Sequence, residues 1–242
     1  SGGPVIRAAL GLARRGVPVF PVWGLQGGRC LCGQDCGRNA GKHPIPARGF
    51  MEASTSEGAI KAWWQRHPEA NVGIRTGQVF RGGRLLVVDI DHAKAGEVGG
   101  EDARLQLPLP ETLRVRTGSG GLHLWYWTPE DACPTIGSRI EAGGVRWAVD
   151  WRGRGGYVLG PPSRHVSGAR YQWEGGAIAE APPELLGLLR EEPPKMAAQP
   201  VVLLPLGEGR AARYLEGALK GEVDRLLTCP EGGRHQIGRA HV

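Results

Sequence analysis

The sequence of residues 84–91 is RLLVVDID, in which a continuous apolar run ends in two aspartates. A short apolar run of this kind is typical of a buried β-strand. Because side chains alternate along a strand, Asp89 and Asp91 are expected on one face, about 7 Å apart, while Ile90 points to the core. Like charges on one buried face are costly unless a cation neutralises them, so this strand end favours Mg²⁺ or Mn²⁺. A solvated strand end with turn-forming aspartates is the alternative.

A third acidic residue, Asp150, lies in a second strand-like segment, VRWAVDWRG at residues 145–153. Alternation places Asp150 on the opposite face from Trp147. Three carboxylates from two strands can hold a pair of metal ions about 3.5–4 Å apart, which is the apparatus of two-metal phosphoryl transfer. The sequence therefore predicts that Asp150 joins Asp89 and Asp91 in one metal site.

Between these two strands, residues 116–127 read RTGSGGLHLWYW, a glycine-rich turn followed by a strand. Backbone N–H groups and a serine hydroxyl in such a turn can cradle a triphosphate, and a nearby histidine can donate to the same phosphates. The residues that we expect in this role are Ser119, Gly120, Gly121 and His123. A flexible hairpin leading into a strand with a satisfied core histidine is the alternative.

The order VVDID, TGSGGLHLWY and VDWRGRGGYVLGPPS resembles the three motifs of the archaeo-eukaryotic primase superfamily, in particular those of its primase-polymerase branch. That family's pattern of paired acids, Ser-Gly-Gly-x-His and a later Asp falls on Asp89 and Asp91, on Ser119 and His123, and on Asp150. The resemblance covers most of residues 5–190 and includes the segments PVWGLQ, GKHP and NVGIRTG.

This resemblance implies an α+β fold, a two-lobed domain whose catalytic sheet is related to the RNA-recognition fold. It implies a template-dependent DNA primase and polymerase that uses single-stranded DNA, a primer, nucleoside triphosphates and two Mg²⁺ or Mn²⁺ ions. By analogy with family members on mobile elements, a helicase domain is expected further along the chain. The rival functions are a metal-dependent nuclease and a catalytically inactive module that binds single-stranded nucleic acid.

The segment CLCGQDCGRNAGKHP, within the loop at residues 28–45, is rich in zinc-preferring side chains. Its candidate ligands are Cys30, Cys32, Cys36 and His43, which favour a structural zinc site. A cysteine-bearing surface loop without metal is the alternative. Lys42 in the same segment and Arg152 beside Asp150 are candidates for phosphate contacts, and Arg75, Arg146 and Arg154 flank the expected site.

Composition limits the class of protein. The chain has 242 residues, a net charge of +6 and a sequence pI near 9.3, which favours a polyanionic partner such as nucleic acid. Its 40 glycines and 19 prolines are scattered between apolar runs, so many short strands are expected and collagen is excluded. The absence of a long apolar segment predicts no membrane span and a soluble, cytoplasmic protein.

Periodicity divides the chain into a catalytic domain at residues 1–190, a linker at 191–209 and the start of a helical segment at 210–236. The last residues, 237–242, match the translation of a common sequencing-library adapter, so we expect a non-native tail on an incomplete reading frame. Within the catalytic domain, helices are expected at 8–15, 56–66, 101–106 and 183–190. Strands are expected at 17–23, at the sheet edge, and at 72–76, 84–91, 112–116, 122–127, 145–151 and 157–159.

Overall fold

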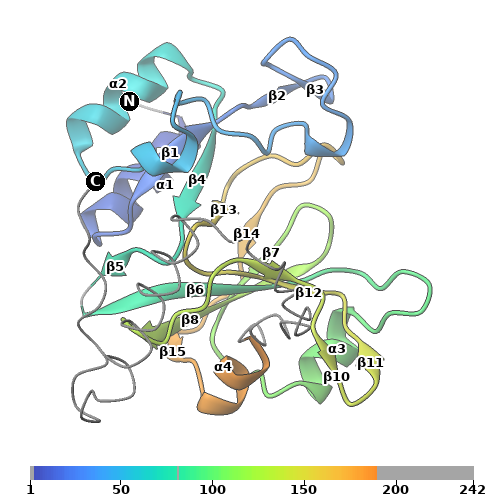
Figure 1. Cartoon of the computed structure of the whole chain (residues 1–242). Helices are drawn as coiled ribbons and strands as arrows, with labels where there is room; N and C mark the ends of the chain where they lie inside the picture. Colours follow the sequence, from blue (N-terminus) through green and yellow to red (C-terminus); the bar gives the residue numbers. More distant parts are fainter. Residues whose placement is uncertain (1–2, 81, 190–242) are drawn as a thin grey trace, which may run out of the picture. The chain divides into compact units, whose positions relative to one another are not determined.

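The computed structural model describes residues 3–80 and 82–189, which belong to the unit Ser1–Glu191 of the chain (Figure 1). Helices and antiparallel sheets alternate along this unit, as expected for an α+β fold. The linker, helical segment and tail expected at 191–209, 210–236 and 237–242 lie outside the described residues. Within the described part of the chain, none of the helices combines the length and the hydrophobicity needed to cross a bilayer.

The first part of the fold is a three-stranded antiparallel sheet packed against two helices (Figure 1). The strand order is β1-β4-β13, so β1, which contains Pro21, is the edge strand that its sequence predicts. The serine that precedes α2, Ser56, accepts a hydrogen bond from the backbone N–H of Ala59 and caps the helix. The elements are α1 (Pro4–Arg14), α2 (Glu57–Arg66), β1 (Val19–Val22), β4 (Asn71–Arg75) and β13 (Tyr157–Gly160).

The second part is a larger sheet with the strand order β14-β7-β8-β6-β12-β9, in which β15 pairs with β8 and β5 with β6. Its central strands are β6 (Gly83–Ile90), β8 (Leu122–Pro129) and β12 (Val149–Arg152). Its outer strands are β5 (Val79–Phe80), β7 (Leu113–Arg116), β9 (Gly137–Ser138), β14 (Gln172–Trp173) and β15 (Ala179–Glu180).

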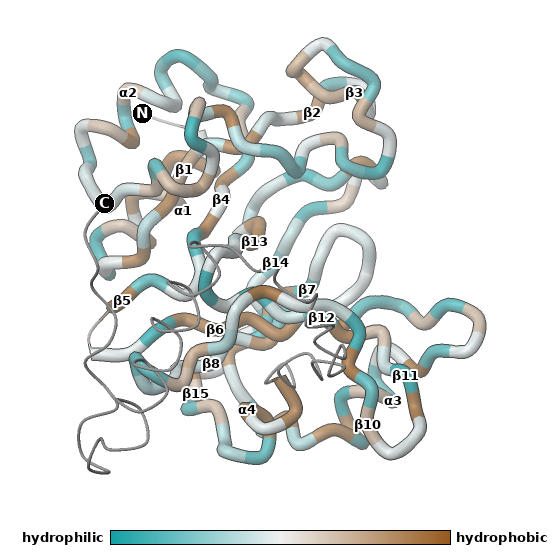
Figure 2. Tube along the Cα trace, in the orientation of Figure 1, coloured by the Kyte–Doolittle hydropathy of each residue, from teal (hydrophilic) through white to brown (hydrophobic). Residues whose placement is uncertain are grey.

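The two faces of the larger sheet belong to two hydrophobic clusters, because side chains of β6 alternate between them. Leu86 and Val88 pack in the cluster that contains α3 (Gly100–Gln106) and α4 (Pro183–Leu189). Leu85 and Val87 pack in the other cluster, with residues of α1 and β1. Figure 2 shows hydrophobic segments on both α1 and α4, which cover opposite faces of the sheet. Polar residues on the face of β6 that carries Leu85 and Val87 therefore point toward the three-stranded sheet.

The strand expected at 145–151 is interrupted. β11 (Val145–Arg146) pairs with β10 (Glu141–Ala142), and β12 begins only at Val149. Between them, Ala148 accepts a hydrogen bond from the backbone N–H of Asp91 at 2.9 Å and donates to Val98 at 2.7 Å. Ala148 therefore bonds to the loop that follows β6, and these bonds join the segment between β11 and β12 to the edge of the sheet. β6 itself ends at Ile90, so Asp91 lies just beyond the strand.

Short elements complete the described fold. A two-stranded hairpin, β2 (Leu25–Gln26) and β3 (Arg29–Cys30), opens the cysteine-rich loop. Two 3₁₀ turns follow, η1 (Gly37–Asn39) and η2 (Gly49–Glu52). None of these four elements has the apolar periodicity by which the longer strands and helices are predicted.

Candidate active site

Three predicted site residues lie in one row across the larger sheet. In the strand register, Asp150 of β12 is opposite Asp89 of β6, and Asp89 is opposite His123 of β8. Neighbouring strands lie about 4.8 Å apart, so the three side chains share a face and are adjacent. The row lies on the face that carries Leu85 and Val87 further back along β6.

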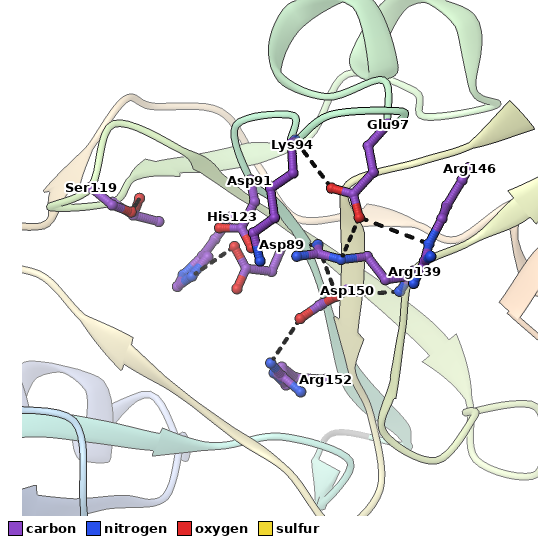
Figure 3. Close-up of polar contacts among 11 residues, drawn as sticks. Asp89, Asp91, Lys94, Glu97, Ser119, His123, Arg139, Arg146, Asp150 and Arg152 are labelled. Atoms are coloured by element: carbon purple, nitrogen blue, oxygen red, sulfur yellow. Dashed lines mark hydrogen bonds and ion pairs between the residues drawn. The ribbon is translucent and has the colours of Figure 1, made fainter. Parts of the chain in front are cut away.

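Asp91 joins this row from the loop after β6, and all four side chains line one cavity of about 770 Å³. Other residues of the cavity wall come from the three-stranded sheet and from the cysteine-rich loop. The wall includes Arg38 and Lys42 of the cysteine-rich loop and Tyr157 of β13, together with Lys94, Arg139, Arg152 and Tyr171. The predicted convergence of Asp89, Asp91 and Asp150 is thus present in the structure, as Figure 3 shows.

Arg139 lies among the carboxylates (Figure 3). Its guanidinium is 3.6 Å from Asp91 Oδ2, 3.3 Å from Glu97 Oε1 and 3.4 Å from Asp150 Oδ1. Its backbone has a positive φ of 59°, a conformation that costs energy for a residue other than glycine. In this conformation the Arg139 backbone N–H also donates to Asp150 Oδ1 at 3.3 Å. One side chain therefore supplies a positive charge to three acids.

Arg152 supplies a second cation, with Nη2 3.3 Å from Asp150 Oδ2. It extends from the same face of β12 as Asp150, two residues further along the strand. Of the arginines that flank the predicted site, Arg152 lines the cavity, whereas Arg146 is 3.8 Å from Glu97 and exposed. Arg75 stacks over the Phe50 ring at 5.6 Å and does not line the cavity.

Burial and mutual repulsion make Asp89 and Asp91 difficult to ionise. Burial raises the pKa of Asp89 to about 6, against the opposing effect of Arg152, and Asp150 adds to the increase. Burial also raises the pKa of Asp91, with a further contribution from the charge of Asp89. Close carboxylates with raised pKa values are the surroundings that a divalent cation stabilises, and oxygen donors of this kind suit Mg²⁺ or Mn²⁺. The donor set therefore fits the predicted metal.

His123 is neutral at physiological pH. Burial, with the nearby charge of Arg152, lowers the pKa of its imidazole to about 3. Its Nε2 lies 3.6 Å from Asp89 Oδ1, a contact that is not an ion pair while the ring is neutral. Its Nδ1 is buried and has no hydrogen-bond partner among the described residues. A neutral imidazole can donate through one nitrogen only, which suits a hydrogen bond to a phosphate oxygen.

The glycine-rich turn does not line the cavity. Ser119 lies beyond His123 in Figure 3, with its hydroxyl 3.0 Å from the Thr117 hydroxyl. A Cβ on Gly121 would lie 2.6 Å from the carbonyl oxygen of Ile90, so the turn packs against the end of β6. Gly120 donates its backbone N–H to the carbonyl oxygen of Thr117 at 3.0 Å. The structure thus brings His123, Lys42 and Arg152 together with the acids, and places Ser119, Gly120 and Gly121 beside them.

The second predicted metal site also comes together. One ligand atom from each of Cys30, Cys32, Cys36 and His43 lies within 4.8 Å of the others. His43 Nε2 is 3.1 Å from Cys30 Sγ and 3.3 Å from Cys36 Sγ, and the sulfurs of Cys32 and Cys36 are 3.4 Å apart. Zinc–ligand bonds of about 2.0–2.3 Å in a tetrahedron imply ligand separations of about 3.5–3.8 Å. The donor atoms therefore suit zinc, and their separations, slightly shorter than this range, would reach tetrahedral spacing through small side-chain shifts.

Glu97, Arg139 and Tyr171 are among the site residues that the sequence did not indicate. Glu97 and Arg139 lie in irregular segments, where no periodicity indicates which way a side chain points. Tyr171 lines the cavity, and its pKa is raised by burial and by the charges of Asp89 and Asp91. The position of Glu97 in the loop directly after Asp91 was the available signal for that residue, whereas nothing near Arg139 in the sequence indicated its role.

Acidic groups that can hold divalent ions and basic groups that can hold phosphates surround one cavity of an α+β domain, an arrangement suited to phosphoryl transfer. The profile of the family described as bifunctional DNA primase/polymerase, N-terminal, matches residues 9–184. Because the match covers more than half of the 242 residues, the chain belongs to this family. Comparison with curated proteins found no match. Membership indicates DNA primase and polymerase activity in general, with DNA and nucleotides as substrates and a divalent metal requirement.

Proposed function

We propose that this protein is a template-dependent DNA primase and polymerase that joins nucleotides with two Mg²⁺ or Mn²⁺ ions held by Asp89, Asp91 and Asp150. The observation that carries the proposal is the meeting of these three carboxylates in one cavity with Arg139, Arg152 and Lys42. Bound there, divalent ions would activate the attacking hydroxyl and stabilise the leaving group. In this reaction the 3′ oxygen of the primer bonds to the α-phosphorus, pyrophosphate leaves, and the hydroxyl proton is released.

The chain's own residues divide the work by charge and position. Lys42 and Arg152 are suited to the phosphates of the incoming nucleotide, because both line the cavity and carry a positive charge. His123, neutral and adjacent to Asp89, can donate one hydrogen bond to the same phosphates. Ser119, Gly120 and Gly121 form a turn beside the cavity. This position is compatible with a contact between the turn and the triphosphate of the incoming nucleotide.

The remaining parts of the proposal rest on the family and on the arrangement of the sheets. The larger sheet would be an RNA-recognition-like catalytic lobe and the three-stranded sheet part of a second lobe, with single-stranded template and primer entering between them. The cysteine-rich loop would carry a structural zinc ion. A helicase partner and a role in replication of a mobile element are proposed by analogy with family members.

Two rival functions make different predictions. A metal-dependent nuclease could use the same carboxylates, but it would have no need for a cluster of cations suited to a triphosphate. An inactive nucleic-acid-binding module would gain nothing from three acids in its cavity, because they repel phosphates. The positive wall favours the polymerase over the nuclease, and the acids favour an enzyme over a passive module.

The test is extension of a single-stranded template by labelled nucleotides with Mg²⁺ or Mn²⁺, with and without a primer. Asp89→Ala and Asp91→Ala should abolish product, while Asp131→Ala, an exposed aspartate on a turn, should leave it unchanged. Product without a primer would establish primase activity. Degraded template without extension would favour the nuclease, and binding without either reaction would favour the inactive module.

A further inference from the structure

The cysteine-rich loop contains the proposed zinc ligands and also forms part of the wall of the catalytic cavity. Its last two candidate ligands, Cys36 and His43, enclose the stretch 37–42, which includes η1. Arg38, Asn39 and Lys42 of this stretch line the catalytic cavity. The loop therefore presents cysteines and a histidine to one another on one side and basic side chains to the carboxylates on the other.

Lys42 acts electrostatically on the acids across the cavity. Its side chain lines the same cavity as Asp89, Asp91 and His123. Coulomb interactions at a protein surface fade within a Debye length of about 8–10 Å. The ammonium of Lys42 is thus positioned to share a ligand with the metal-binding carboxylates.

The loop has little hydrophobic support of its own. Its cluster of buried residues in the described chain consists of Leu25, Cys30 and Ala40. Hydrogen bonds connect its end to the three-stranded sheet: Asn71 Nδ2 donates to the Gly41 carbonyl at 3.0 Å, the Tyr157 hydroxyl donates to the Lys42 carbonyl at 2.8 Å, and the Ile45 backbone N–H donates to the Pro21 carbonyl at 3.0 Å. Ordering a residue costs about 1–2 kcal/mol, so a cluster of this size cannot fix the stretch between the two ligands.

We propose that zinc bound by Cys30, Cys32, Cys36 and His43 fixes Arg38 and Lys42 as the cationic wall that binds the triphosphate of the incoming nucleotide. The inference rests on the proposed function and assigns the zinc loop to substrate binding. A tetrahedral metal site holds both ends of the stretch at fixed points, while Asn71 and Tyr157 hold its carbonyl groups against the cavity. Loss of zinc releases the side chains of Cys36 and His43, so Arg38 and the side chain of Lys42 are no longer held at the wall, although Asn71 and Tyr157 still bond the carbonyl groups of Gly41 and Lys42.

The test compares the full 242-residue chain with Cys36→Ser, Lys42→Ala and the double variant. Zinc content is measured by mass spectrometry, affinity for a non-hydrolysable deoxynucleoside triphosphate with Mg²⁺ by calorimetry, and Mn²⁺ binding alone by electron paramagnetic resonance. Cys133→Ala is the matched control, because Cys133 is buried outside the zinc cluster. It should keep its zinc and its triphosphate affinity.

Cys36→Ser should lose zinc and bind the triphosphate about tenfold more weakly, which corresponds to about 1.4 kcal/mol, while Mn²⁺ binding stays within about twofold. Lys42→Ala should have a similar effect in the zinc-loaded protein and add less than about twofold in Cys36→Ser, because coupled residues are not additive. If Cys36→Ser fails to fold, the wild type treated with a zinc-selective chelator should show the same loss, and added zinc should restore the affinity.

Three results would overturn the inference. Unchanged triphosphate affinity after zinc loss would show that zinc holds only its own loop, and the proposed polymerase function would stand. Full additivity of the two substitutions would show that Lys42 acts independently of the metal. A wild-type chain that binds zinc but no triphosphate, and extends no primer, would refute the proposed function together with this inference.

Discussion

The cost of burying the Asp89 carboxylate can be measured directly by Asp89→Asn in protein without Mg²⁺ or Mn²⁺. The folded pKa of about 6 exceeds the ordinary value of 3.8, so the folded protein holds a proton that the unfolded chain releases. Stability from this group is therefore greatest at low pH and is lost as pH rises through 6. The amide introduced by Asp89→Asn stays neutral at every pH, so the substitution should stabilise the metal-free protein above pH 6.

The magnitude follows from the two pKa values. A difference of about two units corresponds to about 3 kcal/mol at about pH 7.5. The Asp89 side chain is 20% exposed, and solvent screening lowers the expected gain to about 1–3 kcal/mol. The same relation predicts that the gain falls to about half by about pH 5. Titration of His123 also changes stability in this range, but it is present in both proteins and its effect largely cancels in the comparison.

Urea unfolding followed by tryptophan fluorescence at about pH 7.5 and about pH 5 measures this gain, with Asp131→Asn as an exposed control that should change stability little. Mn²⁺ at about a hundredfold excess over its dissociation constant should add about 2.7 kcal/mol to the wild type and little to Asp89→Asn. A destabilised Asp89→Asn at the higher pH would refute the reasoning. So would a gain that does not change with pH, since burial of charge would then not be its cause.

Three further substitutions test the packing and charge of the site. Arg139→Gln should destabilise the metal-free protein by about 1–3 kcal/mol and enlarge the thermal stabilisation by Mn²⁺, because a competing cation is removed; a smaller Mn²⁺ effect would contradict this. Between about pH 6.5 and pH 5, His123→Asn should gain about 2 kcal/mol of stability relative to the wild type, because the unfolded histidine takes up a proton and the folded one does not; urea unfolding of both proteins at both pH values checks it. Gly153→Ala should lower the unfolding free energy by more than about 2 kcal/mol, because its Cβ would overlap the Pro134 carbonyl oxygen, whereas Gly187→Ala in α4 meets open space and should not destabilise in thermal unfolding.

The sequence predicts the central strands and their acids because burial on both faces leaves a strong local pattern. In β6 the apolar run is continuous, and alternation assigns Asp89 to the opposite face from Ile90. What alternation cannot predict is the partner of each residue across the sheet. Asp89 lies between His123 on one neighbouring strand and Asp150 on the other. This arrangement follows from the register of three strands that are far apart in sequence.

Arg139 shows why part of the site stays hidden from sequence reasoning. It has neither strand nor helix periodicity around it, and its positive φ would favour glycine or asparagine at this position. Only the closing of the loop between β9 and β10 brings its guanidinium within reach of Asp91 and Asp150. A residue in a costly conformation at the centre of a charged site is consistent with a functional constraint, because local strain persists only where surrounding contacts impose it.

The cysteine-rich loop contains both kinds of residue: some that the local sequence predicts and some whose position depends on distant parts of the chain. The concentration of three cysteines and a histidine in one short loop indicates the candidate ligand set, because zinc coordination is chemically specific. The position of Lys42 depends also on Asn71 and Tyr157, which lie on two strands of a different sheet, far from the loop in sequence. In the proposed arrangement, the metal and the sheet would act on the two sides of one short stretch. A loop with so small a hydrophobic cluster can therefore hold a charged side chain in place at the catalytic cavity.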